Sequence, residues 1–580
     1  MRCNIKQQDE VANSHIPRSF NFGQSVGGYI WKLLTPDDRV VMSLVQKLEI
    51  EEVLARIMAN RGVSDIPSAL SFLNPKLRDT IPSPFGLKDM SLATKRVVKA
   101  IENKEKITIF ADYDVDGATS GALLYRMFKM LNVKTNTYVP NRTTEGYGPT
   151  PFAINKIAEN HSSLLIIVDC GTTAFTAMAH AKAIGLDVVI LDHHIGADTI
   201  PEVVALVNPN RVDDDFPYKN VAAVGVAFLF AVALRKELRD HGWFEKNDIE
   251  EPDLMTLLDL VALGTVCDVM PLNDLNRALV KCGLHFIMKR SNIGLATLMD
   301  SLYNEAHITT HYLSYTVGPR INAGGRISDS NLGLDLLTSD DRIQSQEIVN
   351  KLEVMNDERR ALEHFLMNEA ITQVENTGID DRQLVIASGE NWHTGVLGIL
   401  ASRLKDRYHR TSLVMAVNSD GFVKGSGRAV RGVSLGNILT RAKDNGLLID
   451  GGGHAMAGGF SLNKDQMTQF IAFAHEEINK CVIANAELVD DARKMEFDAV
   501  LRVGAVNYQL LQAIESAAPF GHGNPQPRVV LVGAKIVKTI VNKSGNLSSF
   551  VVDAEYGDSS KNKALRCVVF RSNSNNLKEF

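Results

Sequence analysis

The chain of 580 residues is poor in the features that mark secreted, membrane-spanning or disulfide-bonded proteins. Its six cysteines stand singly, without a CxxC pair, which argues against a zinc ribbon and a disulfide framework. Its longest apolar run, residues 221–234, has 14 residues, which is too short for a bilayer and typical of a buried helix. No secretory signal is visible at the N-terminus. The sequence therefore predicts a protein of the reducing cytoplasm without a membrane segment.

Two further scarcities bear on the architecture. The net charge of −6 gives no sign of a general attraction to nucleic acid. No proline occurs between Pro319 and Pro519, so nothing interrupts the amphipathic pattern of residues 341–376. Apolar residues recur there at spacings of three, four or seven, which predicts one long helix between two domains. The length of the chain predicts two to four domains in all.

Three short apolar runs each lead into a carboxylate. Runs of this length are typical of buried strands, and the carboxyl ends of parallel strands meet at one edge of a sheet. Crowded carboxylates repel one another unless a multivalent cation holds them, so the pattern predicts a metal site. The runs are residues 107–110, followed by Asp112, Asp114 and Asp116; residues 164–168, followed by Asp169; and residues 188–191, followed by Asp192, His193 and His194. A further acid, Asp268, ends the stretch 260–267.

A calcium-binding EF-hand loop is the first alternative, because Asp112, Asp114, Asp116 and Gly117 match its opening positions. Its twelfth position requires Glu, but Leu123 stands there, and a strand precedes the loop, so this alternative fails. Carboxylates mixed with imidazole favour Mn²⁺ or Mg²⁺, and shared carboxylates are typical of two-metal phosphoester hydrolysis. Taken singly, an Asp after a strand is more often a turn or helix cap.

These segments resemble the four motifs of the DHH phosphoesterases, in the same order. The motifs are residues 112–117, 168–171, 192–194 and 264–268. Further stretches are similar to the RecJ exonucleases within that family: residues 317–326, 392–399, 425–428, 451–460 and 520–525. One position departs from the pattern, because Phe110 stands where many DHH proteins carry a ligand histidine, and Asp112 offers an oxygen instead.

The resemblance implies an α/β fold with a parallel-sheet catalytic domain and a second α/β domain. It predicts these regions: an N-terminal accessory region, 1–90; the DHH catalytic domain, 91–335; a connecting helix, 336–380; the DHHA1 domain, 381–482; and an OB-like β domain, 483–580. The last domain is expected to be incomplete, since the sequence stops after residue 580 where further strands would close a barrel.

The activity that the resemblance implies is that of a single-stranded-DNA-specific 5′-3′ exonuclease. Two divalent cations, Mn²⁺ or Mg²⁺, would assist hydrolysis, mononucleotides would be released, and the process served would be DNA repair and recombination. Expected partners are single-stranded DNA and a single-strand-binding protein or helicase, and the expected state is a monomer. Two alternatives stay open: a DHH phosphodiesterase acting on short oligonucleotides or cyclic dinucleotides, and an inactive DNA-binding scaffold.

The resemblance also implies roles for individual residues. The metal ligands are expected among Asp112, Asp114, Asp116, Asp169, His193 and Asp268, and the catalytic residues are His194, Asp169 and Asp192. His194 is expected to face the scissile phosphate, with support of His193 as the alternative. The expected nucleic-acid contacts are Arg142, Arg320, Asn322, Ser426, Arg428, Gly452 and His454.

Three of these assignments keep alternatives at this point. Arg142 alone would be equally well explained by a surface salt bridge, and the glycines 451–453 by a tight turn. Base stacking is expected of an aromatic residue, with Tyr147, Trp392 and Phe520 as equal candidates.

Overall fold

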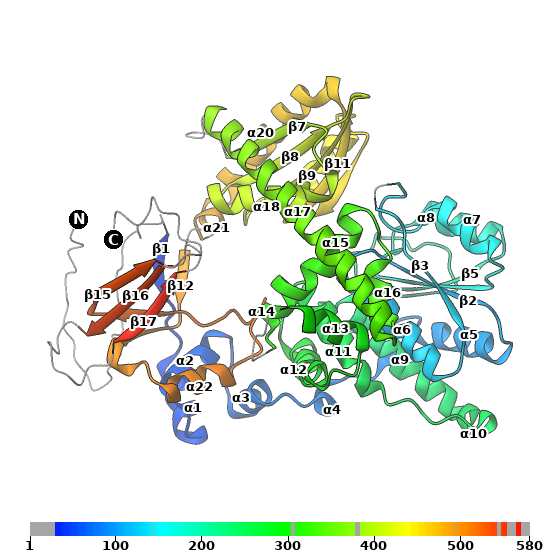
Figure 1. The fold of residues 1–580 in the computed structure, drawn as a ribbon, viewed down its shortest axis with the longest axis horizontal. Coiled ribbons are helices and arrows are strands. Elements are labelled where there is room, and N and C mark those ends of the chain that lie inside the picture. The colour runs from blue at the N-terminus through cyan, green and yellow to red at the C-terminus, as the bar shows by residue number, and fades with distance from the viewer. Residues whose placement is uncertain are drawn as a thin grey trace. The chain divides into compact units, whose positions relative to one another are not determined.

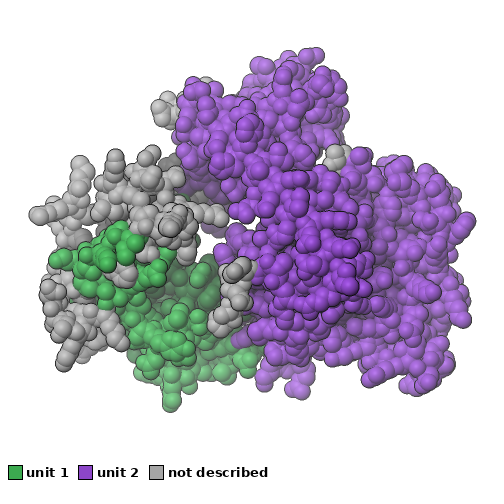
Figure 2. Space-filling model, in the orientation of Figure 1, with its two compact units in different colours: residues 1–75, 493–520, 524–580 green, residues 76–492, 521–523 purple. Residues whose placement is uncertain are grey.

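The computed structural model describes residues 29–142, 144–302, 308–377, 383–491, 494–541, 547–553 and 564–569. The chain divides into two compact units (Figures 1 and 2). Unit 1 comprises residues 1–75, 493–520 and 524–580, and unit 2 comprises residues 76–492 and 521–523. The N-terminal and C-terminal portions of the chain therefore share one unit, and the segment between them forms the other.

A five-stranded parallel sheet forms the first half of unit 2 (Figure 1). Its strands follow the order β3-β2-β4-β5-β6, and every neighbouring pair is parallel. The strands are β2 (Ile107–Ala111), β3 (Thr135–Tyr138), β4 (Leu164–Val168), β5 (Asp187–Leu191) and β6 (Ala205–Val207). The three apolar runs of the sequence are β2, β4 and β5, which are neighbours, and β2 and β4 are buried throughout. This part of the prediction is confirmed.

Helices cover both faces of this sheet. Successive side chains of a strand point to opposite faces, so Ile107 and Ile109 of β2 join the larger core, and Phe110 joins a second core on the other face. The larger core contains α5 (Met90–Glu102), α6 (Val115–Met130) and α9 (Ala223–Asp240), and the second contains α7 (Pro151–Glu159) and α8 (Phe175–Ala183). The longest apolar run lies in α9 and is a buried helix, as predicted.

Shorter helices complete this half of unit 2 and add their apolar faces to the larger core. Before the sheet come α4 (Leu77–Thr80) and η1 (Pro84–Gly86). After it come α10 (Trp243–Asn247), η2 (Leu254–Leu257), α11 (Leu258–Cys267), α12 (Asp274–Lys289), α13 (Ile293–Ser301), α14 (Thr310–Tyr312), the π-helical turn η3 (Leu313–Val317), α15 (Gly318–Ile327) and α16 (Leu332–Thr338).

The long helix predicted from residue 341 onward is α17 (Arg342–Thr377), with 36 residues. A mixed sheet follows it, in the order β10-β11-β9-β8-β7, in which only β7 and β8 pair in parallel. Its elements are β7 (Leu384–Glu390), η4 (Thr394–Val396), α18 (Leu397–Tyr408), β8 (Thr411–Val417), β9 (Phe422–Arg428), α19 (Leu435–Asp444), β10 (Asp450–His454), β11 (Ala457–Asn463), η5 (Lys464–Gln466), α20 (Met467–Ala484) and α21 (Ala486–Asp491).

Unit 1 joins helices from the start of the chain to strands from its end. Strand β1 pairs with β12 in parallel, β13 pairs with β14, and β15, β16 and β17 form an antiparallel sheet. The elements are β1 (Ile30–Leu33), α1 (Asp38–Leu48), α2 (Glu52–Asn60), α3 (Ile66–Leu73), β12 (Lys494–Phe497), β13 (Ala499–Arg502), η6 (Val503–Ala505), α22 (Tyr508–Ser516), β14 (Val529–Val532), β15 (Ala534–Val541), β16 (Leu547–Asp553) and β17 (Leu565–Val569).

The α/β class, the parallel sheet and the long connecting helix are thus confirmed. The expected incompleteness of the final domain stays a prediction, and residues 570–580 lie outside the described part of the chain. Of the helices described, none combines the length and the apolar character needed to cross a bilayer.

Asp498 holds unit 1 together through a buried ion pair. Its two carboxylate oxygens accept from the guanidinium of Arg61 at 2.8 and 3.2 Å, and Asn60 donates to one of them at 3.1 Å. The side chains of Arg61 and Asp498 are only 7% and 4% exposed. A buried charge that loses its partner is strongly destabilising, so this pair ties the end of α2 to the strands at the other end of the chain.

Replacing Asp498 by alanine should lower the free energy of unfolding of unit 1 by about 3–5 kcal/mol, because Arg61 keeps a buried, unpaired charge. Pulse proteolysis in urea, with fragments assigned to unit 1 by mass spectrometry, measures this loss. The matched control is Glu496→Ala, whose pair with Lys32 is half exposed and contributes about 0–1 kcal/mol. Equal losses in the two variants would contradict the assignment.

Candidate metal centre

The acids that follow the strands converge at the carboxyl edge of the parallel sheet. Their ligand atoms form three overlapping groups, and within each group all atoms lie within 4.8 Å of one another. The groups are Asp112, Asp114 and Asp169; Asp169, His193 and His194; and Asp116, His193 and Asp268. Asp169 belongs to two of these groups, and a carboxylate shared between two ligand sets is what two neighbouring cations require, because each of its oxygens can bind one ion.

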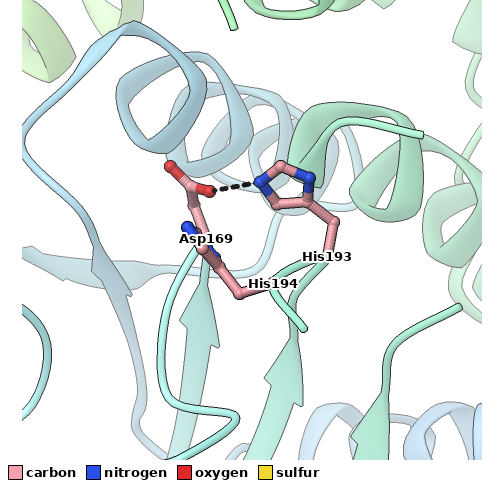
Figure 3. Close-up of side chains that lie close together, drawn as sticks. All are labelled: Asp169, His193 and His194. Carbon is pink, nitrogen blue, oxygen red and sulfur yellow. Dashed lines mark ion pairs between the residues drawn. The ribbon is translucent and has the colours of Figure 1, made fainter. Parts of the chain in front are cut away.

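His193 occupies the middle of this cluster. Its Nε2 atom lies 3.3 Å from Asp169 Oδ1, 3.5 Å from Asp268 Oδ2 and 3.8 Å from Asp116 Oδ2. Figure 3 shows the carboxylate of Asp169 and the imidazole of His193 pointing toward one another. The ends of two strands and of two helices thus bring these four side chains together.

Three polar ligand atoms of the cluster are buried without a hydrogen-bond partner in the described part of the chain. Among the described residues, Asp112 Oδ1, His193 Nε2 and Asp268 Oδ2 are buried and form no hydrogen bond. Buried polar atoms normally find a partner, since an orphaned one is costly. Carboxylate oxygens with one imidazole nitrogen suit Mn²⁺ or Mg²⁺. The residues present therefore fit a divalent cation.

Burial, followed by repulsion from neighbouring carboxylates, raises the pKa values of the acids in the cluster. The pKa values of Asp112 and Asp169 lie well above their usual range, and those of Asp116 and Asp268 rise to about 7 and about 9. Burial and the charge of His194 lower the pKa of His193 to about 4. His193 is therefore neutral at pH 7, which is the form that binds metals.

Asp114 and Asp116 are fixed by two helix N-termini. Asp114 caps α6, and its Oδ1 accepts from the backbone N–H of Asp116 at 2.9 Å. Asp116 in turn accepts from the backbone N–H groups of Ala223 at 2.7 Å and Val224 at 3.0 Å, at the start of α9. A carboxylate oxygen has two lone pairs, so both acids keep acceptor capacity for a cation while the helices set their positions.

Asp192 differs from the other acids because its hydrogen bonds saturate it. Its Oδ2 accepts from the backbone N–H and the hydroxyl of Thr172 at 3.0 and 2.6 Å, and its Oδ1 accepts from His194 Nδ1 at 2.8 Å. Burial opposes ionisation, but the bond and charge of His194, with the charge of His193, hold the pKa of Asp192 below its usual range. Asp192 therefore orients His194 and is not among the grouped ligands.

His194 gains positive character from this arrangement. Burial alone would lower its pKa, but the hydrogen bond and charge of Asp192 raise it to about 9. The hydroxyl of Tyr147 lies 3.2 Å from His194 Nε2 and donates to the main-chain oxygen of Asp169 at 3.3 Å. His194 is thus an imidazolium held at both nitrogens, at the border of the carboxylate cluster.

Two asparagines that the sequence reasoning missed support the histidine pair through its main chain. The side-chain amide of Asn208 donates to the main-chain oxygen of His194 at 2.8 Å, and that of Asn210 donates to the main-chain oxygen of His193 at 2.5 Å. Asn208 directly follows the buried strand β6. It shows the same strand-end pattern as the acids, so extending the pattern from carboxylates to amides would have found it.

Arg142, Arg326 and Arg428 interact electrostatically with one another, and Arg142 and Arg326 also with Asp112 and Asp114 respectively; we call these three residues the arginine group. The guanidinium of Arg142 stacks over the ring of Tyr113, at 4.9 Å from its centroid. Burial, followed by the charge of Arg142, lowers the pKa values of Arg326, to about 10, and of Arg428. Mutual repulsion of this kind marks an excess of positive charge, which suits a phosphate. Arg326 was missed, although it lies within the segment 317–326.

Ser426 lies next to Arg428, whose Nη1 donates to its hydroxyl at 3.3 Å. Gly398, in the first turn of α18, leaves room for both, since a Cβ there would come within 3.0 Å of Arg428 Nη2 and 3.3 Å of Ser426 Oγ. The salt-bridge alternative for Arg142 stays open, since its guanidinium faces the ring of Tyr113 and its charge also acts on Asp112.

Gly452 and His454 lie on β10, at the edge of the second sheet, where the tight-turn alternative had placed a turn. The centroids of the His454 and His194 rings lie 6.2 Å apart, at an interplanar angle of 17°.

Arg320 and Asn322 lie on helix α15. The Arg320 Nε donates to Glu353 at 2.5 Å and its Nη1 donates to the main-chain oxygen of Thr316 at 2.7 Å, while Asn322 is half-buried on the same helix.

The three candidates for base stacking differ in their exposure to solvent. Trp392 is 6% exposed in the core between α17 and α18, and Phe520 packs at the core of unit 1. Tyr147 is 55% exposed beside His194. Phe110 is fully buried and stacks on Tyr138, so it belongs to the core of the sheet.

Comparison with known families matches three parts of the chain. The model of the DHH family, N-terminal domain, matches residues 106–265; that of the DHHA1 domain matches residues 381–480; and that of the RecJ OB domain matches residues 497–579.

Two proteins that carry the name single-stranded-DNA-specific exonuclease RecJ align over most of the chain. The Bacillus subtilis protein is 34% identical over 510 residues, which are 87% of this chain and 62% of that protein. The Escherichia coli protein is 33% identical over 519 residues, 86% of this chain and 88% of that protein. The chain thus spans less than two thirds of the first relative and most of the second.

A solved structure, RecJ from Thermus thermophilus in complex with Mn²⁺, has the same fold. It is 26% identical, its TM-score is 0.73, and the alignment covers 93% of this chain and 74% of that one. The structure of RecJ from the same organism in complex with Mg²⁺ aligns with a TM-score of 0.70.

The first prediction from the cluster concerns metal-dependent stability. Mn²⁺ should raise the free energy of unfolding of the wild-type protein, by about 2.7 kcal/mol at a hundred times its Kd. Asp169→Asn should abolish this rise without loss of stability in EDTA, because it removes one of several mutually repelling carboxylates. Asp169 has a φ of 62°, which asparagine tolerates well.

Thermal unfolding with Mn²⁺ or EDTA measures both effects. Asp340→Asn is the control, since Asp340 pairs with Arg126 and Lys129 away from the cluster and is 44% exposed. A full Mn²⁺ effect in Asp169→Asn, or its loss in Asp340→Asn, would remove Asp169 from the ligand set.

The second prediction concerns pH. Groups whose pKa is raised to about 7 and about 9, as in Asp116 and Asp268, hold protons at neutral pH that a cation must displace. Mn²⁺ affinity should therefore rise as the pH increases through this range. Calorimetry in two buffers of different ionisation enthalpy should detect proton release at pH 7, and an affinity independent of pH would contradict the raised pKa values.

Proposed function

The chain belongs to the RecJ family of DHH phosphoesterases, and on this premise we propose that it is a metal-dependent exonuclease that degrades single-stranded DNA from the 5′ end and releases mononucleotides. The observation that carries the proposal is the convergence of carboxylate and imidazole ligands beside the arginine group. A scaffold that had lost catalysis would not need ligand atoms that are buried and unpaired. Relatives with the same fold hold Mn²⁺ and Mg²⁺.

Divalent cations held at this site would supply Lewis-acid chemistry, by lowering the pKa of a bound water molecule and neutralising charge on the phosphoryl oxygens. Asp169 lies where two ligand groups overlap, so its carboxylate is proposed to be shared, with Asp112 and Asp114 on one side and His193, Asp116 and Asp268 on the other. Burial and mutual repulsion favour the protonated forms of Asp112, Asp116, Asp169 and Asp268, so bound cations would favour their ionised forms.

His194 is proposed to act on the scissile phosphate as a cationic donor. Asp192 holds its Nδ1 at 2.8 Å, which fixes the ring and stabilises the imidazolium. The proton at Nε2 then faces the Tyr147 hydroxyl at 3.2 Å and is available to a phosphate oxygen. Asp192 serves as a positioning residue in this scheme, since its oxygens accept from Thr172, from the His194 ring and from the main-chain N–H of His193, and it belongs to none of the three ligand groups.

The arginine group supports a 5′ polarity. Burial, followed by repulsion from Arg142, lowers the pKa values of Arg326 and Arg428, and a bound anion would offset both effects. A terminal phosphate carries more negative charge than an internal phosphodiester, and guanidinium groups bind it in a bidentate manner. Arg142, Ser426 and Arg428 are proposed to hold this terminal phosphate. Gly452 and His454 on the β10 edge are proposed to follow the backbone, and Arg320 and Asn322 to lie further along the strand.

The wider setting is proposed on the same premise. The protein is proposed to act as a cytoplasmic monomer in DNA repair and recombination, on single strands supplied by a helicase or covered by a single-strand-binding protein. Co-purification and light scattering test these statements independently of catalysis.

A substrate panel tests the activity. With Mn²⁺, the protein should release mononucleotides from 5′-phosphorylated single strands and leave duplexes intact. Asp169→Asn should lower kcat/KM by about 10³-fold or more, because bound ions contribute several kcal/mol to transition-state stabilisation. Asp340→Asn should match the wild type.

The same panel separates the alternatives. Hydrolysis confined to dinucleotides or cyclic dinucleotides would replace the proposal by a short-substrate phosphodiesterase, and binding without hydrolysis would replace it by a scaffold. Release of label from the 3′ end first would overturn the polarity.

A further inference from the structure

The two ends of helix α15 approach residues that neighbour metal-ligand candidates in the sequence. At the start of the helix, a Cβ on Gly318 would come within 2.6 Å of the sulfur of Cys267, the residue before Asp268. Near its end, a Cβ on Gly325 would come within 3.0 Å of the main-chain oxygen of Tyr113. Arg326 and Tyr113 therefore lie at one end of α15, and Cys267, the residue before Asp268, lies at the other; the seven residues from Gly318 to Gly325 span about 10 Å at 1.5 Å per residue.

The π-helical turn η3 precedes α15 and is attached to the last turn of α11. The thiol of Cys267 donates to the main-chain oxygen of Leu313 at 3.6 Å, and the hydroxyl of Ser314 donates to that of Val266 at 3.3 Å. Single π turns within helices are rare and frequently accompany functional sites. Arg320 strengthens the turn through its bond to Thr316.

Tyr315 projects from this turn and is 72% exposed. Its ring stacks on that of His311, with centroids 4.6 Å apart and an interplanar angle of 29°. Val269, which follows Asp268 directly, is 62% exposed. Val269 has a φ of 58°, a strained conformation for a β-branched residue. One exposed tyrosine is ordinary, but a stacked pair on an anchored π turn beside a ligand is not explained by folding.

We propose that the stacked Tyr315 and His311 rings form a platform for an unpaired base on the 3′ side of the scissile bond. The inference rests on the proposed function and adds to it the path of the strand. If the arginine group holds the 5′ phosphate, the strand crosses the cations and leaves past Asp268, where the platform lies. Base stacking on aromatic rings tolerates any sequence and requires a base that is not paired.

The distance between the arginine group and the platform limits which base can stack on it. Arg326 and Tyr315 are eleven residues apart along continuous helix, or about 16 Å. This distance accommodates at most about five nucleotides at the 3.4 Å rise of stacked DNA, and fewer in an extended strand. The base in question therefore lies within the first five nucleotides, and a dinucleotide ends before the platform.

Tyr315→Ala, in the full chain with Mn²⁺, tests the inference on two 5′-phosphorylated substrates. For a 12-nucleotide strand, kcat/KM for removal of the first nucleotide should fall roughly 5- to 150-fold, the range that stacking of one base gives. For a dinucleotide it should stay within about twofold. Tyr315→Phe should retain activity on both, because the ring remains. Phe365→Ala, which removes an aromatic residue 65% exposed on α17, should match the wild type.

A scan of the 12-nucleotide strand with single abasic sites gives the second readout. The wild type should lose activity when the missing base is the one that stacks, and Tyr315→Ala should be insensitive at that position. Equal activity of Tyr315→Ala and wild type on the long strand would overturn the platform, and so would equal losses on both substrates, which would indicate a role in placing Asp268. A wild type that hydrolyses no single strand would instead overturn the proposed function.

Discussion

Mutual repulsion among buried carboxylates is the constraint around which unit 2 is organised. Asp112, Asp116 and Asp169 are each no more than 3% exposed, and burial with neighbouring charge raises the pKa of each. A protein would normally neutralise or separate such groups. Here the parallel sheet brings them to one edge because its strands share a direction, and two helix N-termini hold Asp114 and Asp116 in place. The fold stabilises an arrangement that only added positive charge makes favourable.

Positive charge is concentrated on the neighbouring side in an equally unbalanced form. Arg326 lies near Arg142 and Arg428, and burial with their repulsion lowers its pKa to about 10. Carboxylates next to guanidinium groups would ordinarily form ion pairs with them. Here the ring of Tyr113 holds the guanidinium of Arg142, and the main-chain oxygen of Gly395 accepts from that of Arg326. The carboxylates would bind cations that hold a phosphodiester, and the arginine group would bind the terminal phosphate. The proposed substrate therefore provides a partner for both sets of charges. Helix α15 keeps them at a fixed separation, since it contacts Cys267 at one end and Tyr113 at the other.

Local pattern was sufficient for much of the fold. The strands at residues 107–111 and 164–168 are continuous apolar runs because both faces of the sheet are covered. Helix α17 follows its periodicity from residue 342 to 377 without a proline to break it. No local sequence pattern predicted that the first 75 residues and the last strands belong to one compact unit. It depends on long-range contacts such as that between Arg61 and Asp498, and neither residue carries a local signal for a partner 437 positions away.

The sequence by itself determined which acids and histidines gather, because strand ends in a parallel sheet lie at one edge whatever the details of packing. Only the tertiary structure decided their division of labour. Asp192 is saturated by Thr172 and His194, while Asp112 and Asp268 keep unpaired oxygens, a distinction that rests on neighbours distant in the chain. The tertiary structure also decided that Arg320 pairs with Glu353 and that Arg326 belongs to the arginine group. It likewise decided that Trp392 is buried and Tyr315 is exposed. Residue type fixes what a side chain can do, but burial and charge from non-local neighbours fix which of these it does.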